Sequence, residues 1–483
     1  MLTLSPIDWL IFLGVPFSAW LLGYLRRGQT TGWRGYFLAS GMLPTSNVAA
    51  NYVGANVTFT TIFLLLCNEA YRRGAAVFCV PIFWFAGSLL FTKMYHHLRP
   101  HLKDGKTLHQ ALCDGYGSQA IQKWASLWTI VAFIGTVGLE FYGASLFLQW
   151  AGFARLSSLT LALILAFLCS IFTYSAGLRG IGVADYVLDG AVVACCFVLV
   201  ALLFMPNRGS VSVGTVPVIP PLADSIVFVV AMAVLFIPFQ FCVLDSWQRC
   251  AAWQKKTDSP GRWLLLGALV LSACYSVPIL IGLKMRTEGL LVPDGEHPLG
   301  AFLEARAPGP FWRGLIFAGF ISAVFSTADE LLNCASLTLL FDVFRIPRSL
   351  DDQENGGRKK RVVASGQFYT GLFAFVSALV VLLCMWLAKP ISELALAVFS
   401  GQIVFAVPLF LQFWFPRKPL KMGTPAVIAM FLAFVAGVSL VVTSWIVKDP
   451  TLADAAPIGS FFVALTTLGI AMAVSRVPAG ETQ

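Results

Sequence analysis

Residues 45–68 read TSNVAANYVGANVTFTTIFLLLCN, an apolar run that polar residues and a glycine interrupt in its middle. The run is long enough to cross a membrane once as a helix. A helix break at membrane depth is tolerated only where it lines a cavity or is buried in protein. An unwound turn near Gly54 would free backbone carbonyls that suit a small cation. Close helix packing through small and polar residues is the alternative explanation.

The rest of the chain has the composition of a membrane protein. Its 483 residues are 58% hydrophobic and only 12% charged, too few charges to cover a soluble surface. The sequence therefore predicts an all-α membrane protein with a single transmembrane domain over residues 1–483. Apolar runs predict about thirteen helices, at residues 7–25, 45–68, 75–98, 122–150, 158–176, 185–205, 223–247, 262–283, 311–344, 364–388, 391–415, 424–446 and 457–475.

The distribution of charge predicts the orientation. The formal net charge is +9, and 23 of the 33 lysines and arginines fall in loops on one side of the thirteen spans. By the positive-inside rule that side is cytoplasmic. We therefore expect a multi-pass protein of a bacterial inner (plasma) membrane, with the N-terminus outside, the C-terminus inside and a cytoplasmic linker loop at residues 345–363. We expect membrane lipid to surround the protein. The basic residues are confined to loops between the spans, which argues against nucleic acid as a partner.

No residue pattern indicates an enzyme. The 11 cysteines include no CxxC pair, and the five histidines show no metal-binding spacing such as HExxH. We expect no catalytic activity and no organic cofactor.

A polar stripe runs along the ninth predicted span. Residues 322–336 read SAVFSTADELLNCAS, and the positions of the polar side chains place them on one helical face. Asp329 and Glu330 would be costly against lipid, so we expect them to face a wet cavity, a counter-charge or the cytoplasmic mouth. Ser326 and Thr327 offer hard oxygens that suit a small hard cation, although they also have the option of bonding to their own helix.

A second interrupted span begins at residue 223. Residues 236–249 read FIPFQFCVLDSWQR, and Pro238 removes a backbone donor in mid-span. The two interrupted spans are five apart and run in opposite directions, which indicates an inverted repeat with a binding site between its halves. Asp185 lies at the start of the sixth span, where the helix dipole also favours an acid. Glu140 is a further buried acid to which the sequence assigns no role.

Four of these segments resemble the sodium:solute symporter family. Residues 36–41, YFLASG, match its lead-in to the second helix, and residues 176–185, AGLRGIGVAD, match its glycine-rich loop. Gln248–Arg249 followed by alanines match the end of its seventh helix. The pattern from Ala323 to Asn333 matches its ninth.

The resemblance implies two inverted five-helix repeats in a leucine-transporter-like fold, at residues 45–205 and 223–415. It implies a Na⁺ site made of the carbonyls of Gly54, Val57 and Ala323 and the hydroxyls of Ser326 and Thr327, with Asp185 close by. It also implies a substrate site between the two interrupted spans, near Asn56, Thr60, Thr61, Phe239 and Gln240.

The implied function is the import of a small organic solute by symport with Na⁺ through alternating access. This sequence departs from the family where Glu330 replaces a serine, so Asp329 or Glu330 is a possible carrier of a proton or cation. Two alternatives stay open: H⁺ coupling on the same fold, and a membrane sensor that binds solute without moving it.

Overall fold

The computed structural model describes residues 4–26, 32–41, 45–98, 106–207, 221–253, 261–292, 297–347, 356–414 and 422–476. Of the predicted linker loop at 345–363, residues 348–355 lie outside these ranges. The first half of the described chain forms these helices: α1 (Pro6–Arg26), α2 (Trp33–Leu38), η1 (Ala39–Gly41), α3 (Thr45–Asn56), η2 (Phe59–Leu64), α4 (Leu65–Arg73), η3 (Gly74–Phe78), α5 (Cys79–Leu98), α6 (Leu108–Tyr116), α7 (Gln119–Leu148), η5 (Gln149–Phe153) and α8 (Ser158–Leu203).

The second half continues in the same way, and the described residues are assigned to helices, turns and connecting segments: α9 (Leu222–Cys242), α10 (Leu244–Ala252), α11 (Gly261–Thr287), α12 (Pro298–Arg306), α13 (Pro310–Thr338), η6 (Leu339–Val343), α14 (Gly356–Leu387), α15 (Ile391–Ile403), α16 (Ala406–Trp414), α17 (Gly423–Val447), α18 (Pro450–Asp454) and α19 (Ala456–Arg476). Helices satisfy their own backbone hydrogen bonds, which is what a lipid environment demands.

The predicted all-α membrane fold is confirmed. Twelve described helical stretches are long and apolar enough to cross a membrane. Each of the thirteen predicted apolar runs coincides with helix. The numbers differ because Phe59–Tyr95 counts as one stretch, although α4 ends within it at Gly74, whose φ of 72° and ψ of −147° are not helical. The short helices α2, α6, α12 and α18 were not predicted, because they lie in or beside the connecting segments.

Three of the breaks in the described helices lie in segments that the sequence singles out. The first separates α3 from η2 at Val57 and Thr58, where Thr58 has an extended backbone. The second separates α9 from α10 at the extended residue Val243. The prediction had placed this interruption at Pro238, which instead lies inside α9. The third is a kink at Gly177, whose φ of 59° favours glycine; it replaces the loop expected at residues 176–185, so Asp185 lies within a helix.

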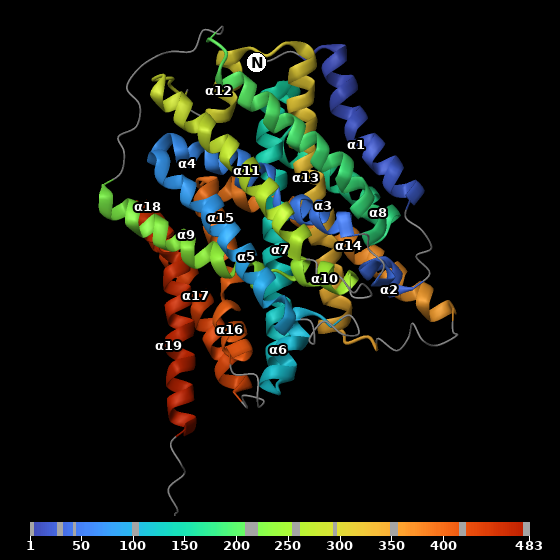
Figure 1. The fold of residues 1–483 in the computed structure, drawn as a ribbon, viewed down its shortest axis with the longest axis vertical. Coiled ribbons are helices and arrows are strands. Elements are labelled where there is room, and N and C mark those ends of the chain that lie inside the picture. Colours follow the sequence, from blue (N-terminus) through green and yellow to red (C-terminus); the bar gives the residue numbers. More distant parts are fainter. Residues whose placement is uncertain are drawn as a thin grey trace, which may run out of the picture.

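Helix α13 forms the centre of the molecule and contacts α8, α1, α7, α14 and α3 (Figure 1). In its most apolar stretch 94% of the residues are buried. Helices α1 and α8 approach closely at Gly23. A methyl group on this glycine would lie only 2.8 Å from the carbonyl oxygen of Gly180. Helices α17 and α19 pack on one another at one side of the bundle.

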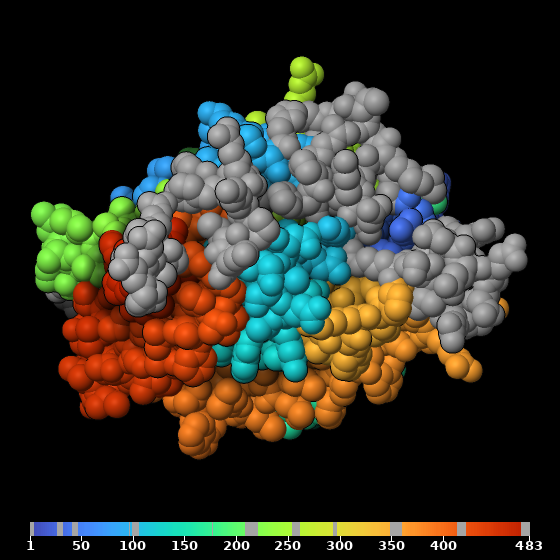
Figure 2. Space-filling view, turned by 90° about the horizontal axis from the view of Figure 1, so that it is seen from below, coloured from blue at the N-terminus to red at the C-terminus, as the bar shows by residue number. Residues whose placement is uncertain are grey.

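One end of the bundle is fixed by a short helix. In Figure 2, which looks onto this end, α6 lies near the centre of the visible face. Asp342 of η6 accepts a hydrogen bond from Thr107, immediately before α6, at 2.8 Å, and one from Gln122 at 3.1 Å. Its other oxygen lies 2.9 Å from Nδ1 of His109. This buried network ties α6 to α7 and to the end of α13.

Candidate functional site

The break after α3 lies against the hydroxyl groups of α13. The hydroxyls of Ser326 and Thr327 donate to the carbonyl oxygen of Gly54 over 3.2 and 3.1 Å, and Ser326 also lies 3.4 Å from the carbonyl oxygen of Ala323. All four residues are fully or almost fully buried. Residues 272 positions apart in the chain therefore bring four oxygen atoms together. Such hard oxygens suit a small alkali cation.

A buried carboxylate lies beside this cluster. A methyl group placed on Gly54 would lie 3.2 Å from Cγ of Asp185, so the carboxylate contacts the backbone at Gly54. Both oxygens of Asp185 are buried and have no hydrogen-bond partner among the described residues. Burying an ionised carboxylate without a partner is costly, and a bound cation would offset that cost. The oxygen cluster and Asp185 together therefore fit a Na⁺ ion.

Glu140 of α7 closes the other side of the break. One of its oxygens accepts hydrogen bonds from the backbone N–H groups of Phe59 and Thr60 at 2.9 and 3.0 Å. The other accepts from the N–H of Thr61 at 3.3 Å. These N–H groups begin a new helix and would otherwise be unsatisfied. In a continuous helix the N–H of Thr61 would donate to the carbonyl of Val57. Because this N–H donates to Glu140 instead, the Val57 carbonyl, which is one of the predicted cation ligands, stays available.

The acids of α13 have different surroundings. Glu330 forms an ion pair with Arg249, which also pairs with Asp245. All three side chains are at most 3% exposed, and they join α10 to α13. Asp329 is buried, and its oxygens have no hydrogen-bond partner among the described residues. Of the two acids predicted as carriers, Glu330 therefore has a direct ion-pair partner, whereas the described residues provide none for Asp329.

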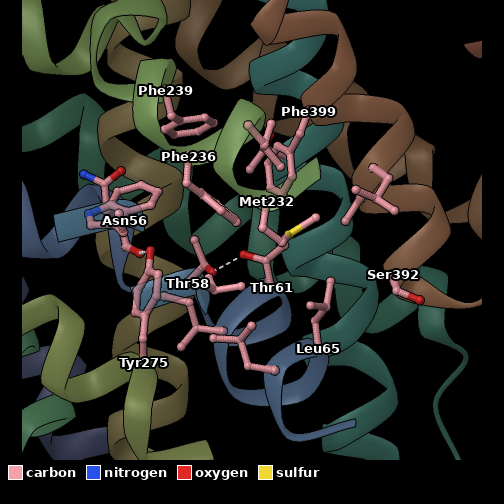
Figure 3. Close-up of a pocket in the computed structure, with 18 of the residues that line it drawn as sticks. Asn56, Thr58, Thr61, Leu65, Met232, Phe236, Phe239, Tyr275, Ser392 and Phe399 are labelled. Carbon is pink, nitrogen blue, oxygen red and sulfur yellow. Dashed lines mark hydrogen bonds between the residues drawn. The ribbon is translucent and has the colours of Figure 1, made fainter. Parts of the chain in front are cut away.

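A cavity begins where α3 ends. It offers about 90 Å³ of space to water-sized molecules. Figure 3 shows residues of the broken helix, among them Asn56, Thr58 and Thr61, facing side chains of α9 and α15 across it. Thr58 and Thr61 are hydrogen-bonded to each other. A pocket lined mainly by apolar side chains with a few polar groups is typical of small-molecule sites.

The residues predicted for substrate binding divide into two groups. Asn56, Thr61 and Phe239 line the cavity. Thr60 is directed to α7, because its hydroxyl donates to the backbone carbonyl of Glu140 at 3.3 Å. Gln240 is turned into the α9–α10 break, where it accepts a hydrogen bond from Ser246 at 3.2 Å. The structure therefore places Thr60 and Gln240 in helix packing around the two breaks rather than on the cavity wall.

An ion cluster lies at one end of the cavity, which Glu69 and Asp454 both line. Arg73 donates to Glu69 at 2.5 Å and lies 2.8 Å from Asp454, with its guanidinium 4.6 Å from the centre of the Phe228 ring. Burial raises the pKa of Asp454 to about 7, with Arg73 opposing the rise. The cluster joins α4, α18 and α9.

Several residues of this region were missed by the sequence analysis. Trp84 and Tyr275 line the cavity from α5 and α11, and Tyr275 donates to the carbonyl of Asn56 at 2.9 Å. Nothing in an apolar run distinguishes such an aromatic residue from one that faces lipid. Glu140 was visible as an acid within a span, but its partners lie about 80 residues away.

No protein-family model matches the chain. The sequence is 26% identical over 443 residues to the sodium/pantothenate symporter of Escherichia coli (strain K12), covering 86% of this chain and 87% of that protein. The structure matches a Na⁺-coupled sialic acid symporter, solved in a substrate-bound outward-open state, with a TM-score of 0.69 and 14% identity over 97% and 98% of the two chains. It also matches a manganese transporter of Eremococcus coleocola with a TM-score of 0.53 and 12% identity over 92% and 95%.

Proposed function

We propose that the chain is a sodium:solute symporter, a secondary active transporter that imports a small organic solute together with Na⁺ by alternating access. Its similarity to a sodium/pantothenate symporter and to a Na⁺-coupled sialic acid symporter supports this proposal. The observation that carries this proposal is the convergence of Ser326 and Thr327 on the carbonyl of Gly54. Beside it lies the carboxylate of Asp185, which has no hydrogen-bond partner among the described residues. Its relatives are transporters rather than enzymes. We place the protein in a bacterial inner membrane with its N-terminus outside.

The ion site is built to couple to the cavity. Na⁺, as the co-transported ion, would be held by Gly54, Val57 and Ala323 carbonyls and by the two hydroxyls of α13. Gly54 is only two residues before Asn56, which lines the cavity. An ion that fixes the end of α3 against α13 therefore orders one wall of the solute site. By linkage, bound solute then raises the affinity for Na⁺ by the same factor.

Alternating access would follow from motion between the predicted repeats, residues 45–205 and 223–415, around this site. One Na⁺ that crosses about 100 mV supplies about 2.3 kcal/mol. A tenfold Na⁺ gradient adds about 1.4 kcal/mol. Together these terms support a solute gradient on the order of several hundredfold.

Binding of ²²Na⁺ to purified protein in lipid nanodiscs tests the proposal without knowledge of the solute. We expect Ser326→Ala and Thr327→Ala each to weaken Na⁺ binding about tenfold, the loss of one ligand. Ser336→Ala is the matched control, because Ser336 lies on the same buried helix and bonds to Thr370 and to its own helix. Equal Na⁺ affinity in all four proteins would refute the assigned site.

Proton coupling is a second candidate. It is favoured by Asp329, whose buried side-chain oxygens have no hydrogen-bond partner among the described residues. In this mechanism Asp329 carries the proton, while Glu330 stays paired with Arg249. Measuring a current after a rapid pH step across proteoliposomes without Na⁺ separates the two. A proton current that Asp329→Asn abolishes supports H⁺ coupling, and its absence in the wild type excludes it.

A further inference from the structure

The electropositive start of the second half of the broken helix is already occupied. Three backbone N–H groups at the start of η2 donate to the two oxygens of Glu140. Both oxygens of Glu140 therefore accept from the helix end, which leaves these N–H groups satisfied. The N-terminus of a broken transporter helix is a place where an anionic solute group binds. Here a side chain of the protein takes that place, so the helix end offers nothing to a solute anion.

The charges around the cavity also disfavour an anion. Its described lining includes the carboxylates of Glu69 and Asp454 but no lysine or arginine. Both acids form an ion pair with the same arginine, Arg73. A solute carboxylate would enter next to two acids whose counter-ion is already engaged. Their repulsion is weakly screened where water is excluded.

The same pairing disfavours a cation. Glu69 has Arg73 at 2.5 Å and Arg72 at 3.8 Å, and Asp454 has Arg73 at 2.8 Å. A solute cation would have to break a buried ion pair to reach either carboxylate, which leaves a charge uncompensated. Neither sign of charge therefore finds a ready partner on the described wall.

What the wall offers is aromatic surface and a few polar side-chain atoms without a hydrogen-bond partner among the described residues, one of which belongs to Gln402. Trp84 lies 5.6 Å from Phe236, 5.2 Å from Phe239 and 5.4 Å from Tyr275, ring centre to ring centre, and Phe399 is 6.0 Å from Phe239. Figure 3 shows several of these rings around the cavity. Gln402, 3% exposed, also lines it, and its side-chain oxygen has no hydrogen-bond partner among the described residues. A solute N–H or O–H would satisfy that acceptor.

We propose that the cavity takes an uncharged solute with an apolar or aromatic body and a hydrogen-bond donor that reaches Gln402. The body packs against the aromatic rings around Trp84. The inference rests on the proposed transport function, which it deepens by assigning the class of solute. It excludes carboxylates as preferred cargo.

Three probes of the same skeleton and different charge test this directly: 3-phenylpropanamide, 3-phenylpropanoate and 3-phenylpropylammonium. Their binding to the wild-type protein in lipid nanodiscs is measured by isothermal titration calorimetry in NaCl and in KCl, at slightly alkaline pH. We expect the amide to bind at least about tenfold more tightly than either charged probe, and more tightly in Na⁺. A charged probe that binds as tightly as the amide, or failure of all three to bind, overturns the inference.

Two variants identify the residues responsible. Gln402→Leu removes the acceptor at nearly constant side-chain volume and should weaken amide binding about fivefold to tenfold. Gln367 does not line the described cavity wall, so the control substitution Gln367→Leu should leave amide binding unchanged. Glu140→Ala frees the helix N-terminus and should raise the affinity for the carboxylate probe relative to the amide. If Glu140→Ala does not fold, Glu140→Gln, which keeps the shape and removes the charge, should change the ratio in the same direction. No change in the ratio for a folded variant refutes the role of Glu140.

The outcome is separable from that of the proposed function. Wild-type ²²Na⁺ binding that depends on Ser326 and Thr327, together with a preference for the carboxylate, would reject the solute class and leave the symporter proposal intact. Na⁺ binding that does not depend on these hydroxyls would reject the symporter site, whatever the probes do.

Discussion

At the scale of single residues, Gly54 has the tightest requirement in the candidate ion site. Its carbonyl accepts from two hydroxyls of α13, and its Cα faces the carboxylate of Asp185. A side chain at this position requires the carboxylate of Asp185 to shift by a few tenths of an ångström. Glycine is therefore needed here for close approach rather than for an unusual backbone angle.

Gly54→Ala should consequently impair the site. The new methyl group, 3.2 Å from Cγ of Asp185, should cost about 1–3 kcal/mol through overpacking and lower the affinity for Na⁺. Gly14→Ala is the control, since a methyl group on that α1 glycine meets nothing within 4 Å and should change stability by no more than about 1 kcal/mol. Thermal unfolding and ²²Na⁺ binding measure both effects. Equal behaviour of the two variants would contradict the close contact with Asp185.

Glu140 supports a second prediction at this scale. Glu140→Gln replaces one carboxylate oxygen by an NH₂ group that faces backbone N–H donors, so we expect a loss of about 1.5–3 kcal/mol in stability. Na⁺ affinity should fall as well, because the turn that frees the Val57 carbonyl loses its cap. Ser126→Ala is the control on the same helix, where the hydroxyl bonds to the carbonyl of Gln122. A Glu140→Gln protein as stable as this control would show that the cap contributes little.

At the scale of elements, the molecule is held around its cavity by links between helix ends. The ion cluster of Glu69, Arg73 and Asp454 joins α4 to α18. The cluster of Asp245, Arg249 and Glu330 joins α10 to α13. A buried ion pair adds little net stability but is costly to leave half broken. Such links favour two discrete arrangements of the helices over a continuum, which suits alternating access.

The stability of the folded protein should depend on pH through Asp454, because burial favours the protonated form of this acid. Burial raises the pKa of Asp454 from an ordinary value of 3.8 to about 7, so the folded protein holds this proton more tightly than the unfolded chain. Its contribution to stability is therefore complete below pH 4 and is lost as pH rises toward 7, with a slope of at most about 1.4 kcal/mol per pH unit. Asp454→Asn should show a flatter dependence of thermal stability on pH between about 4 and 7.

Asp449→Asn provides the comparison for this experiment. Asp449 begins the same short helix, where it accepts a hydrogen bond from the N–H of Thr451, and asparagine caps a helix equally well. We expect this variant to follow the pH profile of the wild type. A wild-type profile for Asp454→Asn would mean that the acid titrates near its ordinary pKa.

At the scale of the whole molecule, a cation bound between α3 and α13 would join the break in the early part of the chain to the central helix of the bundle. An ion that binds only the folded protein stabilises it by about 2.7 kcal/mol at a hundred times its Kd. We expect NaCl to raise the unfolding temperature of the wild type above that in equimolar KCl. The double variant Ser326→Ala/Thr327→Ala should lose this difference. A rise that persists in the double variant would place the stabilising ion elsewhere.

The amino-acid sequence by itself determined the membrane class, the positions of the apolar helices and the hydroxyl-bearing face of residues 322–336. These properties depend on length, hydropathy and helical spacing, which are local. It also indicated that the segments around Gly54 and Ser326 act together, through their resemblance to a family. Even at this level the second break was predicted at Pro238 and occurs at Val243, because proline inside a helix is tolerated where neighbouring helices support it.

Only the tertiary structure decided what each polar group contacts. Glu140 and the N–H groups of residues 59–61 are about 80 positions apart, and no periodicity relates them. The same holds for Tyr275, which bonds to Asn56, and for Thr60, which is directed to α7 instead of the cavity. Within an apolar membrane-spanning helix, hydropathy does not distinguish a side chain that faces lipid from one that faces a cavity. That distinction arises from which helices pack together, and it fixes both the ion site and the cavity wall.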